Sequence, residues 1–316
     1  MRMKFAFVVF FALFTAEAAQ QPVQQALLSN ETLSVNVDRV NVLFTVANRR
    51  GEFITHLGRD DFSVFEDEEI QNVSNFSIEA ELPLNIAFLI DSSGSIRDKL
   101  GFERQAAARF FHSAVRRGKD HVLVMSFDTT ATLLQDYTDN PALLTEAVQK
   151  IIPGGATSLY QAVFEAAAHR LAERPGRRII IILSDGMDNS SHVPLGKTLE
   201  AAQKNDVIIY AVSTNGIDHS DPQDRKIGDA ILKHLAEETG GRALCPTRMQ
   251  DLAASFTRIM EELRSQYSLA YGPTNTLRDG TYRHIRIVAS HRGYTIRSRD
   301  GYYAPDSGRS RSGGPS

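Results

Sequence analysis

The sequence predicts an α/β domain with a doubly wound, mostly parallel sheet, inserted in or flanked by a smaller antiparallel β domain. Between residues 83 and 265, short and continuously apolar runs alternate with amphipathic helical patterns. On either side, the segments 20–82 and 266–305 contain runs in which apolar residues recur mostly at every second position, within residues 31–80 and from residue 267 onward, separated by turn signals. Strand–helix alternation is typical of a parallel sheet covered by helices, whereas period-two alternation is typical of strands with one buried face.

The apolar runs of the central region are expected to be strands buried on both faces. They occupy residues 85–90, 121–127, 178–183 and 207–212. Consecutive apolar residues indicate such strands, because both faces of a parallel sheet are covered. Helices are expected at residues 98–116, 141–150, 158–173, 195–204, 225–238 and 250–265.

The flanking segments are divided into short strands by Asn48-Arg49-Arg50-Gly51, Asp279-Gly280 and Arg292-Gly293. Neither segment is long enough to bury a core of its own. We therefore expect residues 20–82 and 266–305 to pack together as one discontinuous β domain. The alternative is two separate β appendages on the α/β domain. Residues 306–316 form a polar tail that we expect to be disordered.

The first 19 residues predict a secretory signal peptide. Arg2 and Lys4 precede an apolar run from Phe5 to Phe14, and small residues at alternating positions follow it. The run is shorter than the about 20 apolar residues that a membrane-spanning helix needs. An uncleaved N-terminal anchor is the alternative. We expect an exported protein, periplasmic or secreted, with no membrane span after cleavage.

The net charge and the cysteine content exclude several kinds of binding site and cross-link. The formal net charge of the 316 residues is −3, so no broad basic surface for nucleic acid is expected. The single cysteine, Cys245, excludes an intramolecular disulfide and a zinc site of the multi-cysteine kind. It follows Gly240-Gly241 in a short apolar run, and we expect a small buried strand residue there.

Oxygen-bearing side chains gather at one predicted edge of the sheet. Asp91, Ser93 and Ser95 follow the first central strand, Asp185 follows the third, and Thr157 precedes the third helix. In open α/β sheets, ligands bind outside the carboxyl ends of the strands. Alternate side chains of an extended segment point the same way, so the first three are expected to face one point. The five residues predict one metal site.

The donor set favours a hard divalent cation. Carboxylate and hydroxyl oxygens suit Mg²⁺, with Mn²⁺ or Ca²⁺ as alternatives. Two carboxylates balance the charge of one divalent ion, and hydroxyls and waters leave the ion electron-poor. An octahedral ion with a replaceable water then accepts an acidic ligand from outside. The alternative is a vestigial site held together by hydrogen bonds alone.

This arrangement resembles the metal-ion-dependent adhesion site of von Willebrand factor type A domains. The pattern is Asp91-x-Ser93-x-Ser95, with Thr157 in a Gly-Gly-x-Thr loop and Asp185 in a Ser-Asp-Gly loop. The resemblance covers residues 83–265 and implies a Rossmann-like sheet with Mg²⁺ or Mn²⁺ at its top. It also implies that the serines and sometimes the threonine bind the metal directly, that the aspartates bind directly or through water, and that a partner's Glu or Asp completes the coordination.

The flanking segments resemble exported bacterial proteins related to the same family. Asp-Asp-Phe-x-Val-x-Glu-Asp precedes the domain, from Asp60 to Asp67, and Gly-Tyr-Tyr-Ala-Pro follows it, from Gly301 to Pro305. Adhesion relatives couple ligand binding to movement of the last helix, here residues 250–265. Since that helix runs almost directly into the C-terminal β segment, we expect a shift there to reach the β domain.

The sequence therefore predicts a metal-dependent protein-binding module for adhesion or complex assembly, and no catalytic residue. One alternative is a structural scaffold with a stabilising metal only. A more remote alternative is a phosphate-ester hydrolase, which would need a second acid where Ser93 stands. Neither a Gly-x-Ser-x-Gly elbow nor a phosphate-binding P-loop is found in the sequence.

Overall fold

The computed structural model describes residues 39–217, 221–248 and 250–306. The predicted signal peptide, the strand-like run at 33–37 and most of the polar tail lie outside these residues. Among the described helices, none has the length and apolar character that crossing a membrane requires.

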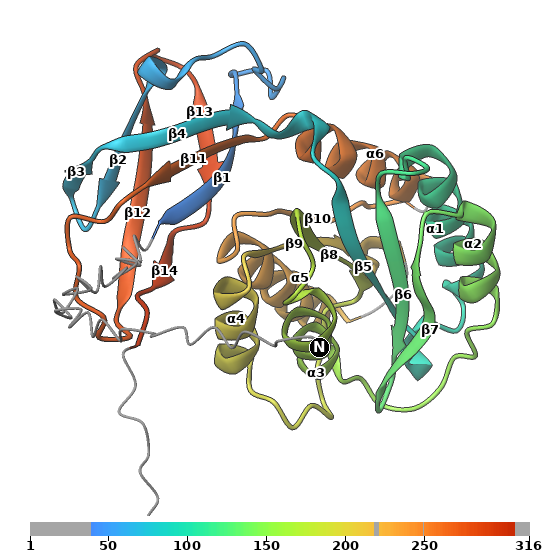
Figure 1. Ribbon diagram of the computed structural model, residues 1–316. Coiled ribbons are helices and arrows are strands. Elements are labelled where there is room, and N and C mark those ends of the chain that lie inside the picture. Colours follow the sequence, from blue (N-terminus) through green and yellow to red (C-terminus); the bar gives the residue numbers. More distant parts are fainter. Residues whose placement is uncertain (1–38, 218–220, 249, 307–316) are drawn as a thin grey trace, which may run out of the picture. The chain divides into compact units, whose positions relative to one another are not determined.

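The central sheet has six strands in the order β10-β9-β8-β5-β6-β7 (Figure 1). The strands are β5 (Leu84–Asp91), β6 (His121–Phe127), β7 (Ala131–Thr138), β8 (Arg177–Ser184), β9 (Val207–Ser213) and β10 (Ala243–Leu244). All neighbouring pairs are parallel except β6 and β7. The antiparallel edge strand β7 was not expected from the sequence, because its residues are half-buried and lack a continuous apolar run.

Helices cover both faces of this sheet, which confirms the predicted doubly wound arrangement. They are α1 (Leu100–Ala114), α2 (Pro141–Gln149), α3 (Leu159–Glu165), α4 (Leu195–Lys204), α5 (Pro222–Glu237) and α6 (Asp251–Leu263). Phe111, Leu144 and Phe256 place α1, α2 and α6 in the core on one face. Val163 and Leu232 belong to the core on the other face, with α3, α4 and α5.

Two of the helix starts follow directly from local sequence. Pro141 opens α2, and the Asn140 side chain accepts a hydrogen bond from the backbone of Ala142. Pro222 opens α5 in the same way, after Asp221. Proline suits the first helical position because its missing N–H would have no partner there. The helix expected at 158–173 is divided, since α3 continues as a wider π-helical turn, Ala166–Leu171.

The flanking segments form two four-stranded antiparallel sheets. One has the order β13-β1-β11-β4 and the other β14-β12-β2-β3. The N-terminal flank supplies β1 (Val40–Ala47), β2 (Phe62–Glu66), β3 (Glu69–Gln71) and β4 (Val73–Ile78). The C-terminal flank supplies β11 (Tyr267–Tyr271), β12 (Tyr282–Ala289), β13 (Thr295–Ser298) and β14 (Gly301–Tyr303).

Strands from the two flanks therefore pair within both sheets and share one apolar core. Strand β1 pairs with β11 and β13, and β2 pairs with β12. Phe44 and Val64 from the first flank pack with Tyr267 and Ile287 from the second. Either flank alone would leave its apolar residues exposed to water. The two segments therefore depend on each other to bury this core.

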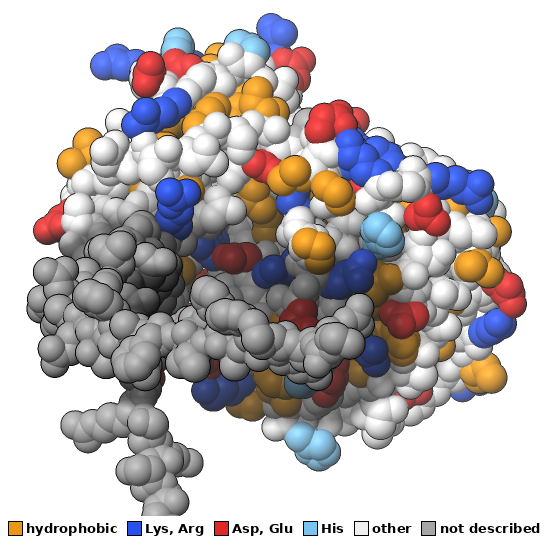
Figure 2. All heavy atoms as spheres, viewed as in Figure 1, with side chains coloured by type: hydrophobic (Ala, Val, Ile, Leu, Met, Phe, Trp, Pro, Cys, Tyr) orange, Lys and Arg blue, Asp and Glu red, His pale blue; other side chains and the backbone are white. Residues whose placement is uncertain are grey.

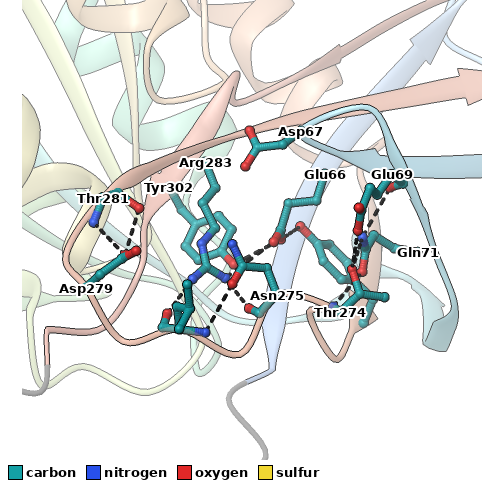
Figure 3. A network of polar contacts seen from close by, with 12 residues as sticks. Glu66, Asp67, Glu69, Gln71, Thr274, Asn275, Asp279, Thr281, Arg283 and Tyr302 are labelled. Carbon is teal, nitrogen blue, oxygen red and sulfur yellow. Dashed lines mark hydrogen bonds and ion pairs between the residues drawn. The ribbon is translucent and has the colours of Figure 1, made fainter.

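A buried polar cluster joins the same two flanks (Figure 3). The Glu66 carboxylate accepts hydrogen bonds of 2.8 Å from the Tyr271 hydroxyl and 2.9 Å from the Tyr302 hydroxyl. Arg283 lies 3.4 Å from the other carboxylate oxygen and also donates to the carbonyls of Asn275 and Leu277. Glu66 belongs to the acidic motif of the first flank, and Tyr302 belongs to the Gly-Tyr-Tyr-Ala-Pro motif of the second. The two flanking motifs thus meet in one cluster.

Charged side chains of both signs are interspersed on the surface. Figure 2 shows Lys and Arg beside Asp and Glu over the described part of one face. Several form pairs one helical turn apart, such as Lys150 with Glu146 and Lys204 with Glu200. Exposed pairs of this kind contribute little to stability, but their mixing avoids an area of single charge on this face.

Candidate metal centre

Asp91 is the last residue of β5 and its side chain is fully buried. One carboxylate oxygen accepts a hydrogen bond of 2.8 Å from the backbone N–H of Ser93. The other accepts one of 2.7 Å from the Ser184 hydroxyl, at the end of the neighbouring strand β8. Because both oxygens are held, the carboxylate has a fixed orientation at the edge of the sheet.

The serines of the first loop meet through a turn. Ser93 is extended, with φ −64° and ψ 171°, but Gly94–Ile96 form a 3₁₀ turn. The expectation that an extended chain aligns Asp91, Ser93 and Ser95 therefore holds only as far as Ser93. The turn brings the chain back, so that the two serine hydroxyl oxygens lie 3.0 Å apart.

Asp185 follows β8 and joins the first loop. The Ser95 hydroxyl donates a hydrogen bond of 2.9 Å to one Asp185 carboxylate oxygen. The other oxygen accepts from the backbone of Met187 at 3.0 Å. The carbonyl of Asp185 accepts a 2.6 Å hydrogen bond from the Asn215 side chain. Asp185 is thus held by its own loop, by the first loop and by Asn215 in the loop after β9.

The loop before α3 connects with both other loops. The backbone of Gly154 donates to Ser92, at 2.8 Å, and the backbone of Gly94 donates to Gly155, at 3.3 Å. Gly155 has φ +76°, and a Cβ there would lie 2.8 Å from the Thr129 hydroxyl. This position therefore requires glycine.

Thr157, in the same loop, is tied to the third loop by Asn189. The Asn189 side chain accepts from the backbone N–H of Thr157 at 2.8 Å, and the backbone of Asn189 donates to the Thr157 carbonyl at 2.9 Å. Thr157 is buried. Backbone and side-chain hydrogen bonds therefore join all three loops that carry Asp91, Ser93, Ser95, Thr157 and Asp185.

The electrostatics of the site favour a cation. Burial, and secondly the charge of Asp185, raises the pKa of Asp91 to about 6. Hydrogen bonds from Ser93 and Ser184 oppose this rise without cancelling it. A divalent ion would relieve the repulsion between the two carboxylates.

The donor set fits a hard ion that keeps some of its water. In the described part of the chain, no three His, Cys, Asp or Glu side chains gather to hold a metal. The arrangement instead has two carboxylates with hydroxyl oxygens beside them and neither nitrogen nor sulfur. Mg²⁺ suits such a site, because it is commonly bound through one or two carboxylates and retains several waters.

Other polar residues at this edge support the loops. Asp128 accepts from the backbone of Thr130 at 3.1 Å, as its turn position suggests. Asp188 accepts from the backbone of Tyr160 at 3.1 Å and from the Ser191 hydroxyl at 2.6 Å, so it caps α3. Ser184, Asn189 and Asn215 were not singled out from the sequence. Only Ser184 carried a signal, because it directly precedes Asp185.

The expectation for Cys245 was wrong. The residue follows the two-residue strand β10 and is exposed, because the apolar run there is too short to enter the sheet interior. Partial burial of the thiol, and secondly the nearby Asp229, raises its pKa to about 11. The thiol therefore stays protonated at neutral pH and is a poor nucleophile.

The family follows from this sheet and from the matched sequence. Residues 86–187 match the von Willebrand factor type A domain family, and this stretch runs from β5 to the loop that carries Asp185. The chain therefore contains a von Willebrand factor type A domain, and its flanking segments form two small antiparallel sheets.

One mycobacterial protein is similar to part of this chain. An uncharacterised protein of Mycobacterium tuberculosis is 28% identical over 124 residues, which cover 37% of this chain and 20% of the relative. The chain therefore spans a fifth of that protein's length.

Solved structures with partial likeness include proximal thread matrix protein 1 from the mussel byssus, with a zinc-occupied metal-ion-dependent adhesion motif. Its TM-score is 0.49 at 17% identity, over 63% of this chain and 50% of that one. The PilB minor pilin of Streptococcus sanguinis gives a TM-score of 0.48 at 13% identity, over 58% and 62%. BatB of Bacteroides thetaiotaomicron gives 0.44 at 13% identity, over 56% and 98%.

Proposed function

We propose that the α/β domain binds one divalent cation through Asp91, Ser93, Ser95, Thr157 and Asp185. The observation that carries this proposal is the hydrogen bond between Ser95 and Asp185, which brings a hydroxyl from one loop onto a carboxylate from another. Mg²⁺ is the first choice for these donors, with Mn²⁺ or Ca²⁺ as substitutes.

The bound ion would serve to hold an acidic side chain of a partner protein. Asp91 is fully buried, whereas Ser95 is exposed. The site is therefore closed by carboxylates on the sheet side and open toward solvent on the side of the second serine. A cation held there would offer its outward position to a carboxylate oxygen, which is a hard ligand of opposite charge.

The rest of the chain would present this module outside the cell. The apolar run near the N-terminus supports export to the periplasm or the medium, and the β domain would position the α/β domain within a complex. We assign binding and not catalysis, because Ser93 stands where phosphoryl transfer would need a second acid.

Capture of partners by the full chain tests the proposal. Wild-type protein and the double variant Asp91→Ala/Asp185→Ala are compared against the native exported fraction, with Mg²⁺ and with EDTA. Asp98→Ala, an exposed acid just after the first loop, is the matched control. We expect the same partner with wild type and control in Mg²⁺, and its loss with EDTA or in the double variant.

Two outcomes would contradict the proposal. If the double variant retains the partner in EDTA, binding does not use the metal. If Mg²⁺ raises the melting temperature of the wild type but changes no interaction, the ion only stabilises the loops and the domain is a scaffold. If the partner is captured in Mg²⁺ and lost in EDTA, replacing its acidic residues one at a time identifies the carboxylate that binds the metal.

A further inference from the structure

Thr157 differs from the other four candidate ligands in how the fold places it. Asp91, Ser93 and Ser95 lie at or just after the end of β5, and Asp185 directly follows β8. Thr157 lies instead in the connection between α2 and α3. The central sheet therefore anchors the other four residues, whereas the place of Thr157 has to come from hydrogen bonds between loops.

The backbone of Thr157 is bound by the loop that carries Asp185. Its N–H donates a 2.8 Å hydrogen bond to the Asn189 side chain. Its carbonyl accepts hydrogen bonds from the backbone N–H groups of Asn189, at 2.9 Å, and Ser190, at 3.0 Å. Within the same loop, the Asp185 carboxylate accepts from the backbone of Met187 at 3.0 Å. One short loop thus holds both the Asp185 carboxylate and the backbone of Thr157.

The residues on either side of Thr157 are bound to a different loop. The backbone N–H of Ala156 donates 3.1 Å to the Thr129 hydroxyl, and that of Ser158 donates 2.7 Å to the Asp128 carbonyl. Both acceptors follow β6. Thr157 therefore bridges the loops after β6 and β8, and the loop after β8 binds both of its own backbone polar groups.

Asn189 makes this connection without contributing to a core. It is exposed, yet its side-chain oxygen and its backbone N–H each bond to Thr157. Alanine at this position would remove the side-chain acceptor and keep the two hydrogen bonds to the Thr157 carbonyl. Such a change would loosen Thr157 relative to Asp185 while the fold of the loop is kept.

We propose that Asn189 is a positioning residue that sets which divalent cation the metal site prefers. Mg²⁺ requires nearly octahedral ligands at about 2.0–2.1 Å, whereas Ca²⁺ accepts ligands at about 2.3–2.6 Å in a flexible geometry. Donors held firmly relative to one another discriminate by ion size, and mobile donors adapt to the larger ion. By holding Thr157 to the loop of Asp185, Asn189 favours the smaller ion. This inference rests on the metal binding of the proposed function and adds the residue that controls its selectivity.

Calorimetric titration of the full chain with Mg²⁺, and separately with Ca²⁺, tests the inference. Asn189→Ala removes the acceptor for the Thr157 N–H. We expect the Kd for Mg²⁺ to rise by about tenfold and the Kd for Ca²⁺ by less than about threefold. The ratio of the two Kd values decides, because a general disturbance of the fold would weaken the binding of both ions together.

Asn189→Asp is the conservative variant. It keeps an oxygen that accepts from the Thr157 N–H and adds a negative charge. The charge attracts both divalent ions alike, so its effect cancels in the ratio of the Kd values. We expect this variant to restore the wild-type ratio.

Asn140→Ala is the matched control. The Asn140 side chain also accepts from a backbone N–H, that of Ala142 at 3.1 Å, where α2 begins. It follows the end of β7, which pairs with the start of β6 at the edge opposite the metal site, roughly 20 Å away. Loss of this helix cap should lower the melting temperature by about 2–4 °C and leave the ratio of the Kd values unchanged.

Amide hydrogen exchange in EDTA provides a readout that needs no metal. In Asn189→Ala, peptides that contain Thr157 should exchange about tenfold faster than in the wild type, because the Thr157 N–H has lost its acceptor. In Asn189→Asp and Asn140→Ala the same peptides should exchange at the wild-type rate. Equal exchange in Asn189→Ala and the wild type would overturn the inference whatever the metal affinities are.

The titrations separate failure of this inference from failure of the proposed function. If the wild type binds Mg²⁺ and Asn189→Ala keeps the wild-type ratio, the inference is wrong and the proposed function stands. The inference is also wrong if the wild type binds Ca²⁺ more tightly than Mg²⁺, or if Asn189→Asp behaves like Asn189→Ala. If the wild type binds neither ion, the proposed function and the inference both fail.

Discussion

The hydroxyl of Ser95 donates a 2.9 Å hydrogen bond to the carboxylate of Asp185, a residue 90 positions further along the chain. The bond joins the loop after β5 to the loop after β8. The bond holds two candidate ligands beside each other in the metal-free protein. It therefore reduces the conformational entropy that the two loops lose when a metal binds.

The first prediction concerns this bond. Ser95→Ala removes both a candidate ligand and the donor that orients Asp185, so we expect metal affinity to fall by about 10–100-fold. Because Ser95 is exposed, stability in EDTA should change by no more than about 0.5 kcal/mol. Titration with Mn²⁺ measures the first effect and urea unfolding the second. Ser92→Ala, at the position directly before Ser93 and not among the candidate ligands, serves as control and should bind the metal normally.

A second prediction follows from the raised pKa of Asp91. Cations need the ionised carboxylate, so affinity should fall as the pH drops through the pKa of about 6. At pH 5 about one tenth of this group is ionised, and the Kd for Mn²⁺ should be about tenfold weaker than at pH 7.5. An unchanged Kd across this range would contradict the prediction.

As part of the same prediction, the raised pKa of Asp91 should give the metal-free protein the opposite dependence of stability on pH. The pKa of Asp91 is about 6 in the folded state against 3.8 as the ordinary value. Between these values the folded state holds a proton that the unfolded state has lost. The stabilising contribution is thus fully present below pH 3.8 and is lost as the pH rises through 6. In EDTA, Asp91→Asn should remove this part of the pH dependence of the melting temperature.

Much of the α/β domain could be predicted because its signals are local. Apolar runs gave the buried strands β5, β6, β8 and β9 to within about one residue, and helical spacing gave α4 with its observed bounds. The edge strand β7 escaped prediction, because its residues are mixed in polarity and its pairing with β6 is set by tertiary contact.

The candidate site could be predicted only in part for a similar reason. Asp91 and Asp185 directly follow recognisable strands, so their places at one sheet edge follow from topology. Asn215 has no motif, and its bond to the Asp185 carbonyl depends on the packing of β9 beside β8.

A third prediction concerns the contact of α5 with the third metal loop. A Cβ at Gly228 would lie 2.0 Å from the carbonyl oxygen of Asp185. Gly228→Ala should therefore displace this loop, cost about 1–3 kcal/mol of stability, and weaken metal binding. Gly196→Ala on α4 is the control, because a Cβ there meets nothing within 4 Å, and it should stabilise the helix by up to about 1 kcal/mol. Equal stability of the two variants in urea would refute the prediction.

A fourth prediction concerns the cluster that joins the two flanking segments. Glu66→Gln leaves the buried guanidinium of Arg283 without its carboxylate, and we expect a loss of about 3–5 kcal/mol. Tyr302→Phe removes one hydrogen bond to Glu66 and should cost about 1 kcal/mol. Urea unfolding compares the two variants. If Glu66→Gln lowers the free energy of unfolding no more than Tyr302→Phe does, the charges of the cluster do not stabilise the fold.

The last prediction concerns the link between α6 and the β domain. Glu262 on α6 is buried and forms ion pairs with Arg297 of β13 and with Arg242, each at 3.2 Å. If α6 shifts when the metal site is filled, this ion pair would pass the shift to β13. Mg²⁺ should then slow amide hydrogen exchange in both α6 and β13 of the wild type.

Arg297→Met should confine that response to α6, because Glu262 keeps Arg242 but loses its connection to β13. Arg297 is 34% exposed in its side chain, so the loss of stability should be only about 1 kcal/mol. Arg286→Met, which removes an exposed pair with Glu68 on β12, is the control and should leave the response of β13 intact. Equal exchange in β13 with and without Mg²⁺ in the wild type would show that the ion pair transmits nothing, and that it serves only to hold the β domain to α6.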